Sequence, residues 1–242
     1  MRVLVTRPRE DAAGLVAALA ARGHKVTLEP LLTIVERADP DWPAGHDRAQ
    51  ALLITSANGA RAFARCDPRR DLPAYAVGDA SAAALRELGF RQVVSAAGDV
   101  DDLAALVHRR LDPGDGPLLH PAAGKPAGDL QGALAAAGFE VLRAWLYDAV
   151  AVERLSGETT RQLNEGLIDA ATFFSPRTAG AFVSLVEAAA LAPSCRKVAA
   201  LCLSPAVAAA LSGLAWRRVC VAARPDQAAL LAALDALAAD DR

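Results

Sequence analysis

The stretch Ala76-Val-Gly-Asp-Ala-Ser-Ala-Ala-Ala-Leu85 decides the fold, because it returns as Cys202-Leu-Ser-Pro-Ala-Val-Ala-Ala-Ala-Leu211. The two copies also keep their spacing downstream, where Val93 corresponds to Val219. The period exceeds 100 residues. A repeat of that length indicates a duplicated half-protein, whereas solenoids repeat every 20 to 50 residues or so.

The duplication extends upstream from this segment and has an interleaved order. Residues 54–63 match residues 173–182, and a separate stretch beginning at Val3 matches one beginning at Leu118. In that second pair, Gly23 corresponds to Gly138. We name the stretches that begin at Val3 and Leu118 A1 and A2. We name the stretches that contain residues 54–85 and 173–211 B1 and B2. Along the chain the order is therefore A1, B1, A2, B2.

Each stretch has the pattern of an α/β protein. Short apolar runs alternate with helical patterns, and one such pattern ends at Gly23, a residue that commonly follows a helix. Strands are predicted at 3–5, 26–28, 31–35, 51–54, 74–77 and 92–96, and helices at 11–22, 58–64, 80–88 and 100–111. Apolar strands that alternate with helices indicate parallel sheets covered on both faces.

The connections between the stretches predict two domains that share the chain unevenly. B1 runs into A2 through the tight loop 112–116, a length typical within one sheet. The other two connections, 36–50 and 151–168, are longer. A tandem arrangement would place its domain boundary in the tightest loop, so the interleaved arrangement is favoured. We predict a discontinuous domain of residues 1–36 and 152–242, a central domain of residues 38–149, and linkers near 34–38 and 148–153 that act as a hinge.

Composition narrows the class of protein. The chain has 242 residues, 53% of them hydrophobic, and a net charge of −2, so no global charge points to nucleic acid or to an anionic membrane. We expect neither a leader segment nor a membrane span. The four cysteines show no C-x-x-C pair and no zinc spacing, which favours buried free thiols in a reducing cytoplasm.

The predicted carboxyl ends of the strands suggest an anion site. In open parallel sheets ligands bind at these ends, and helix N-termini there favour anions. The ends are rich in small and hydroxyl residues, and Arg7, Lys125 and Arg177 lie among them. Each residue alone would also suit an ordinary helix cap or a solvated loop. The recurrence of the pattern in both halves favours a ligand with several anionic groups.

Other motifs are absent or incomplete. Gly124-Lys125 resembles part of a phosphate loop, but Pro126 replaces the required hydroxyl residue. Gly78 lacks the other glycines of a dinucleotide-binding motif. His120 ends a predicted strand, and a functional and a structural role are about equally supported.

An ordered set of motifs resembles the uroporphyrinogen-III synthase family over nearly the whole chain. The set consists of residues 3–8, 54–63, 76–82, 146–147 and 173–179. The resemblance implies an α/β fold of two interleaved, parallel-sheet domains of the flavodoxin or Rossmann type, with a two-stranded linker and an interdomain cleft.

The resemblance also implies a reaction. Hydroxymethylbilane, a linear tetrapyrrole with eight carboxylates, would be closed to uroporphyrinogen III with inversion of ring D and loss of water. It implies no metal or organic cofactor, no nucleic acid and no membrane partner, and a cytoplasmic location. It leaves room for a transient contact with the preceding enzyme, hydroxymethylbilane synthase. The alternative is a non-catalytic, two-lobed anion-binding or sensor protein.

The family pattern also assigns residues. Tyr147 matches a tyrosine that assists departure of the hydroxyl group. The substrate-binding positions are Arg7, Ser56, Ala57, Asn58, Gly78, Ser81, Gly124, Lys125, Ser175, Arg177 and Ser204. One departure is Val207, where the family commonly has threonine. The contact of that hydroxyl is lost, or is supplied by the backbone or by Ser204.

Overall fold

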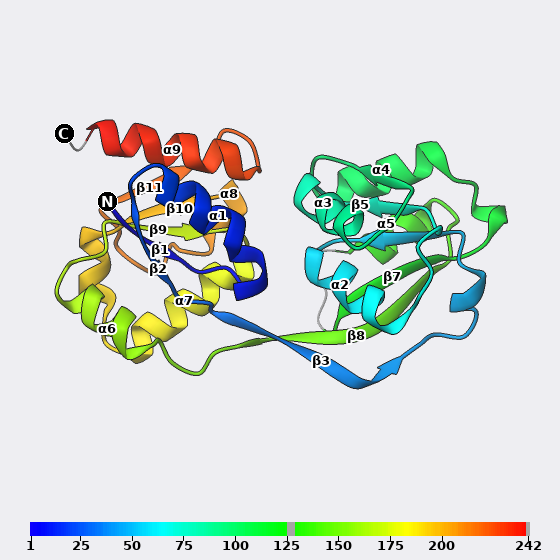
Figure 1. Ribbon diagram of the computed structural model, residues 1–242, viewed down its shortest axis with the longest axis horizontal. Helices are drawn as coiled ribbons and strands as arrows, with labels where there is room; N and C mark the ends of the chain where they lie inside the picture. Colours follow the sequence, from blue (N-terminus) through cyan, green and yellow to red (C-terminus); the bar gives the residue numbers. More distant parts are fainter. Residues whose placement is uncertain (125–128, 241–242) are drawn as a thin grey trace. The chain divides into compact units, whose positions relative to one another are not determined.

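The computed structural model describes residues 1–124 and 129–240 and divides the chain into two compact units. Unit 1 consists of Met1–Thr33 and Val150–Arg242, and unit 2 consists of Ile34–Ala149 (Figure 1). Each unit is an α/β layer structure, in agreement with the predicted fold class. No helix within the described ranges is long and apolar enough to cross a membrane.

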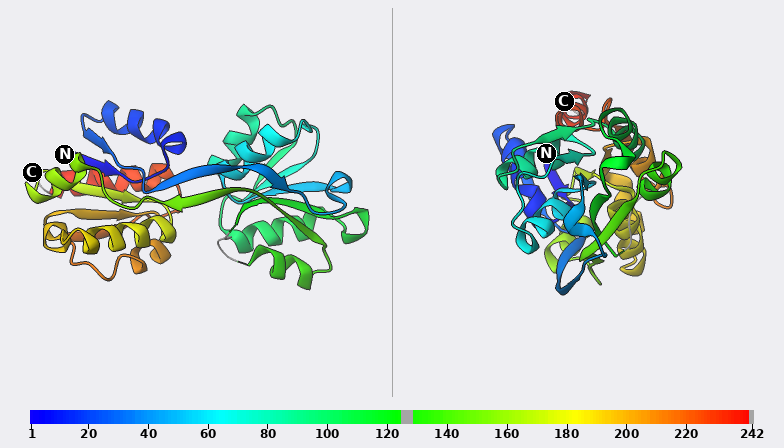
Figure 2. Two further views of the ribbon diagram at one scale, coloured as in Figure 1. Left: turned by 90° about the horizontal axis from the view of Figure 1, so that it is seen from below. Right: turned by 90° about the vertical axis from the view of Figure 1, so that its right-hand side faces the viewer.

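Unit 1 contains a five-stranded parallel sheet in the order β11-β10-β9-β1-β2. Helices cover both of its faces (Figure 2). The hydrophobic core on one face contains residues of α1 and α9, and the core on the other face contains residues of α6, α7 and α8. The strands are β1 (Arg2–Val5), β2 (Lys25–Leu28), β9 (Ala170–Phe173), β10 (Ala199–Cys202) and β11 (Arg218–Val221); the helices are α1 (Arg9–Ala21), α6 (Gly157–Asn164), α7 (Pro176–Ala188), α8 (Pro205–Ala209) and α9 (Gln227–Asp240).

Unit 2 contains a six-stranded sheet in the order β3-β8-β7-β4-β5-β6. Its two cores lie under α2 and α3 on one face and under α4 and α5 on the other. The strands are β3 (Leu32–Asp41), β4 (Ala51–Ile54), β5 (Ala74–Ala76), β6 (Val93–Ser95), β7 (Leu118–Ala123) and β8 (Val141–Ala151); the helices are α2 (Ala57–Cys66), α3 (Asp79–Glu87), α4 (Val100–Arg110) and α5 (Leu130–Ala136). Strands β3 and β8 each run from one unit into the other.

The strand register reproduces the sequence repeat residue by residue. Val3 pairs with Ala170 in unit 1, and the corresponding Leu118 pairs with Ala51 in unit 2. The other three ladders of the repeat keep matching registers as well. The order A1, B1, A2, B2 is therefore the order of two sheets that share the same five-strand arrangement, one of them circularly permuted and extended by β3. In each sheet the topological switch point lies between the A strand and the first B strand, at β1/β9 and at β7/β4.

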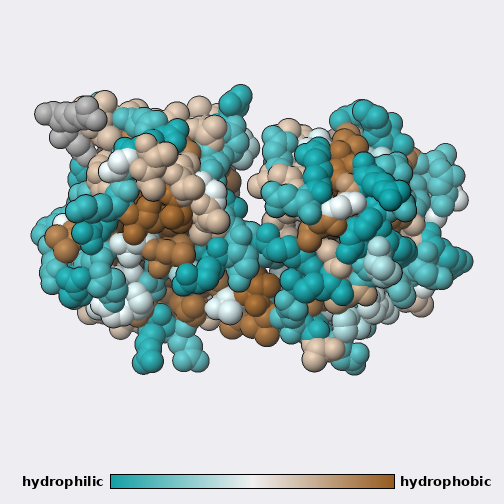
Figure 3. Space-filling view, in the orientation of Figure 1, coloured by the Kyte–Doolittle hydropathy of each residue, from teal (hydrophilic) through white to brown (hydrophobic). Residues whose placement is uncertain are grey.

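Local sequence explains why these elements begin and end where they do. Gly23 and Gly138 follow corresponding helices at φ +77° and +87°, a backbone region that favours glycine. Ser56, Ser175 and Ser204 each cap a helix through a hydrogen bond from the backbone N–H three residues later. Outside the cores, hydrophilic side chains cover much of the visible surface of each unit (Figure 3).

One predicted loop is partly a strand. The sequence predicts an irregular connection over 36–50, but β3 extends to Asp41 and includes Pro40. Proline lacks a backbone N–H, so within sheets it is found on edge strands, at strand starts or at bulges, and β3 is an edge strand of its sheet. The proline therefore signals the edge of a sheet here, and not a break in the chain.

Candidate active site

The carboxyl end of β4 presents a fixed hydroxyl group. Ser56 is the N-cap of α2, and its Oγ accepts a hydrogen bond of 3.1 Å from the backbone N–H of Gly59. The same Oγ lies 2.9 Å from the phenol oxygen of Tyr147 on β8. The cap therefore orients the serine toward the tyrosine, and two residues assigned from the family pattern are in direct contact.

Tyr147 is held in place by its strand. The ladder between β7 and β8 carries an irregularity at Ala122/Ala123, after which Ala123 pairs with Tyr147. Such a bulge redirects the side chains that follow it. Tyr147 is 6% exposed and packs into the core under α2 and α3, and its carbonyl accepts a hydrogen bond from the N–H of Gly124.

The switch point between β4 and β7 is tightly packed. A Cβ at Gly59 would lie 2.9 Å from the Pro121 carbonyl oxygen, so only glycine lets α2 approach β7 this closely. A Cβ at Gly124 would lie 2.6 Å from the Asp148 carboxylate. Gly59 is therefore a site of close approach between two backbones, whereas Gly124 lies against the side chains of Asp148 and Trp145.

The sequence predicts that His120 ends its strand, and this prediction is wrong. Strand β7 continues through Pro121 to Ala123. The backbone N–H groups of Leu118 and Gly124 donate to carbonyls of the segment 140–147, on the β8 side of β7. Because successive residues of a strand alternate between the two neighbouring strands, the backbone of Pro121 faces β4. The ladder between β4 and β7 ends at Leu119, so the N–H that Pro121 lacks would have had no partner there. His120 itself is buried, and its Nε2 lies 3.2 Å from Thr55 Oγ1. Burial lowers the pKa of His120 to about 4, and the charge of Arg143 acts in the same direction.

Arg143 is a candidate that sequence reasoning missed. It lies on β8, is half-buried, and donates from Nη2 to the carbonyl oxygens of Ala123 and Gly124. Its Nε is buried without a hydrogen-bond partner, and no carboxylate in the described ranges forms an ion pair with it. The result is a cation beside the exit of β7 that lacks a counter-ion. The sequence offers one signal for this residue, namely a charged arginine within the mostly apolar strand β8.

The other predicted residues of unit 2 lie along the same rim in different environments. Ala57 begins α2, and Asn58 is buried and accepts from Arg61. Gly78 precedes α3, and a Cβ there would meet open space. The Ser81 side chain is buried in α3. Lys125 lies outside the described residues.

The rim of unit 1 carries the remaining predictions. Thr6 Oγ1 donates to the Thr172 carbonyl at 2.6 Å across the switch point, and the Arg7 guanidinium lies 4.3 Å from the Phe174 ring centroid. Ser175 caps α7, where Arg177 is exposed.

Val207, where the family pattern predicts threonine, occupies a buried position next to the Ser204 cap. Ser204 caps α8 and accepts a hydrogen bond from the Val207 N–H. The Val207 side chain is 1% exposed and belongs to the core under α7 and α8. Valine therefore fills the core at this position, and its backbone N–H completes the Ser204 cap.

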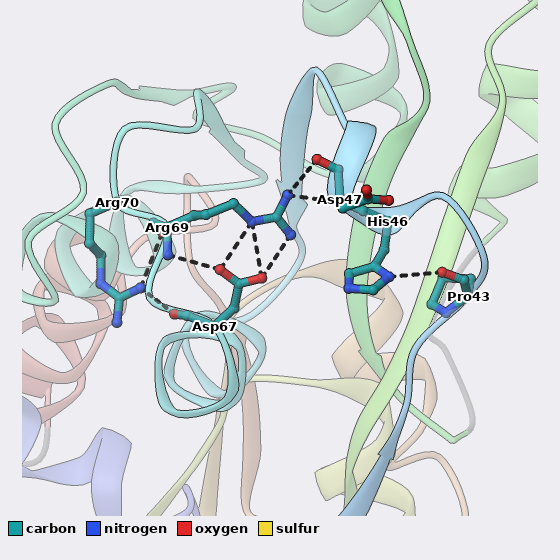
Figure 4. A network of polar contacts seen from close by, with 6 residues as sticks. All are labelled: Pro43, His46, Asp47, Asp67, Arg69 and Arg70. Atoms are coloured by element: carbon teal, nitrogen blue, oxygen red, sulfur yellow. Dashed lines mark hydrogen bonds and ion pairs between the residues drawn. The ribbon is translucent and has the colours of Figure 1, made fainter.

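A prominent polar network of unit 2 is structural. Arg69 makes a two-pronged contact with the Asp67 carboxylate and donates to the carbonyls of His46 and Asp47, while Arg70 donates to the Asp67 carbonyl (Figure 4). Burial acts to raise the pKa of Asp67, but the hydrogen bonds from Arg69 outweigh it and hold the pKa below its ordinary value. The network joins the segments that precede β4 and β5, so it lies at the amino ends of the strands.

Metal ions in proteins are bound by clusters of suitable side chains. Within residues 1–124 and 129–240, no group of three or more histidine, cysteine, aspartate or glutamate side chains is arranged to hold a metal ion.

Two sheets that share five strands in the same order and register, with serine-capped helices at their switch points, define an internally duplicated, doubly wound α/β protein. A family model described as uroporphyrinogen-III synthase HemD matches residues 13–232. The chain belongs to the uroporphyrinogen-III synthase family. It is therefore an enzyme of tetrapyrrole biosynthesis, and the non-catalytic alternative is not favoured.

Solved structures share the fold. Uroporphyrinogen-III synthetase from Helicobacter pylori 26695 matches with a TM-score of 0.65 and 17% identity, over 98% of this chain and 100% of that chain. A mutant uroporphyrinogen III synthase from the extremely thermophilic bacterium Thermus thermophilus matches with a TM-score of 0.57 and 22% identity, over 98% of this chain and 97% of that chain. No curated protein matches the chain in sequence.

Proposed function

We propose that the enzyme closes hydroxymethylbilane to uroporphyrinogen III, with Tyr147 as the group that assists departure of the hydroxyl. The observation that supports this role is the 2.9 Å contact between Tyr147 and Ser56. In the net reaction water is eliminated and the macrocycle closes, which is lyase chemistry. Loss of hydroxide yields an azafulvene, a spiro intermediate follows, and ring D is reattached in the inverted orientation.

The hydrogen-bond inventory of the pair supports a proton-donor role. Ser56 Oγ already accepts from the Gly59 N–H, so its own proton can point to the phenol oxygen of Tyr147. In that direction the serine stabilises the negative charge that develops as the phenol donates to the leaving hydroxyl. The product of the transfer is water, and the phenol recovers its proton when the pyrrole is deprotonated later in the sequence.

Substrate binding is proposed at the strand ends of both units. Hydroxyl groups, helix N-termini and the cations Arg7, Lys125 and Arg177 would hold the carboxylates of the substrate. A ligand held by both rims requires the two domains, residues 1–36 with 152–242 and residues 38–149, to close on it about the linkers near 34–38 and 148–153. This positioning would favour the rearranged product over spontaneous closure. A transient contact with hydroxymethylbilane synthase would shorten the exposure of the unstable substrate.

We also place the enzyme in the cytoplasm. All four cysteines are free thiols. Burial raises the pKa of Cys195 and Cys202 to about 11, so both thiols stay protonated and unreactive at neutral pH. Of the other two thiols, Cys66 is exposed and Cys220 is half-buried, so the prediction of buried thiols is correct for Cys195 and Cys202 and wrong for Cys66. Unpaired thiols fit a reducing compartment.

The test is direct conversion of hydroxymethylbilane, followed by absorbance with separation of the product isomers. We expect uroporphyrinogen III to form faster than the unrearranged isomer that appears without enzyme. Formation of only the unrearranged isomer, at the uncatalysed rate, would overturn the proposed reaction.

A further inference from the structure

One edge of the unit 1 sheet is open where the corresponding edge of unit 2 is paired. By register, β2 corresponds to β8, since Val3 pairs with Val26 and Leu118 pairs with Val141. Strand β8 has β3 as its outer neighbour, whereas β2 is the last strand of its own sheet. The duplication thus shows, within one molecule, the same edge with and without an added strand.

The open edge presents hydrogen-bonding groups of the backbone. The N–H groups of Lys25 and Glu29 donate to β1-side carbonyls, those of Met1 and Val5, at 2.9 Å each. In a parallel ladder alternate residues face the partner, so Val26 and Leu28 direct their N–H and C=O groups outward. No hydrogen bond joins these outward groups to another residue in the described ranges. A paired strand would satisfy them.

A cavity of about 480 Å³ lies along this edge. All four residues of β2 line it, together with Arg2, Glu158 and Gln162. Its wall on α6 is fixed by hydrogen bonds: Thr27 Oγ1 donates to Gln162 Oε1 at 2.7 Å, and Gln162 Nε2 donates to Glu158. Gln162 is buried, so this wall is a packed part of the fold.

Two positively charged residues that line the cavity, Arg2 and Lys25, could bind an anion. The side chains of Arg2 and Lys25 have no ion-pair partner within the described part of the chain. The one carboxylate among the lining residues, Glu158, is paired with Arg161 at 2.8 Å, and the charge of Arg2 acts on it more weakly in the same direction, toward a lower pKa. A ligand at this edge therefore meets two cations whose charge is not compensated by a direct ion pair, a combination that favours carboxylates.

We propose that the β2 edge binds an extended acidic segment of a partner protein, which adds to the sheet as a further strand. The peptide backbone would pair with Val26 and Leu28, and alternate acidic side chains would reach Arg2 and Lys25. This surface consists of residues of β1, β2 and α6 and shares none with the proposed active site. A lysine on an edge strand can also serve only to prevent unwanted pairing, which is the competing outcome.

The experiment uses the full chain and a fluorescein-labelled peptide of alternating glutamate and valine, with binding followed by fluorescence anisotropy. Two controls need no change to the protein. The first is a peptide of alternating lysine and valine, and the second is the acidic peptide N-methylated at alternate residues, which removes the backbone donors of one edge. We expect both controls to bind at least about ten-fold more weakly, because charge attraction and strand pairing are each required.

Variants then locate the site. Lys25→Glu should weaken binding of the acidic peptide by about ten-fold or more and leave the synthase rate unchanged. The matched control is Arg218→Glu on β11, the opposite edge of the same sheet, which should bind as the unaltered chain does. Equal binding of the N-methylated and unmethylated peptides, or of the acidic and basic peptides, would overturn the proposal. If Lys25→Glu does not fold, the peptide comparison on the unaltered chain decides alone.

Discussion

The phenol oxygen of Tyr147 lies 2.9 Å from Ser56 Oγ, although 91 residues separate the two in the chain. One hydroxyl comes from a helix cap after β4 and the other from a strand two positions away in the sheet. Their contact crosses the switch point, the place where ligands bind in folds of this type. The contact gives the family-derived tyrosine a specific chemical partner.

Tyr147→Phe should lower the rate of uroporphyrinogen III formation by about 100-fold or more and leave folding nearly unchanged, because a positioned acid is lost while the ring is kept. The isomer mixture should shift toward the spontaneous product. The matched control is Tyr75→Phe, which removes the hydroxyl of a buried tyrosine on β5 in the same sheet. A wild-type rate and isomer ratio in Tyr147→Phe would make Tyr147 structural.

Arg143→Met should weaken the binding of uroporphyrinogen III by about ten-fold and reduce its dependence on salt, because the variant removes from the rim a cation that has no ion-pair partner in residues 1–124 and 129–240. Arg143→Lys should retain most of the salt dependence. The control is Arg65→Met, since Arg65 is exposed and paired with Glu36 at 2.7 Å. Calorimetric titration at two ionic strengths gives both quantities, and an unchanged affinity in Arg143→Met would restrict Arg143 to supporting β7.

His120 should make the folded state less stable in mild acid. Burial lowers its pKa from 6.5 to about 4, so between these values the unfolded chain binds a proton that the folded chain does not. Stability is fully present above pH 6.5 and is lost as the pH falls toward 4, by about 2 kcal/mol at pH 5. Urea unfolding at pH 5 and pH 7.5 measures this loss.

His120→Gln is the matched variant for the pH series. It removes the titrating group, so its stability should change less between pH 7.5 and pH 5 than that of the unaltered chain. An equal loss in both proteins would mean that other groups, such as Asp67 with its lowered pKa, dominate the acid response.

Gly59→Ala should destabilise the chain by about 1–3 kcal/mol, because the new Cβ would lie 2.9 Å from the Pro121 carbonyl and α2 would have to shift away from β7. Gly180→Ala in α7 is the control, since a Cβ there has no neighbour within 4 Å and alanine favours the helix by about 1 kcal/mol. Thermal unfolding compares the two, and equal effects would contradict the close approach at Gly59.

Much of the fold could be predicted because the repeat and the apolar periodicity are local patterns. The predicted strands 51–54 and 3–5 lie within a residue of β4 and β1, and the serine caps follow from residue type at the helix starts. The extent of β3 and β7 could not be predicted, since each contains a proline that reads locally as a break. Whether a proline interrupts a strand depends on the neighbour that its missing N–H would have met, and that neighbour is distant in sequence.

The sequence by itself determined the duplication, the interleaved order, the α/β class and the family, because all of these depend on residue order and spacing alone. Only the tertiary structure decided that Ser56 meets Tyr147, that Arg143 lies beside the end of β7 with no ion-pair partner among the described residues, and that the β2 edge is open while the β8 edge is paired. The physical reason is that these relationships join strands and helices far apart in the chain. Register, bulges and the order of strands in the sheet set the distances between such groups, and no local pattern encodes them.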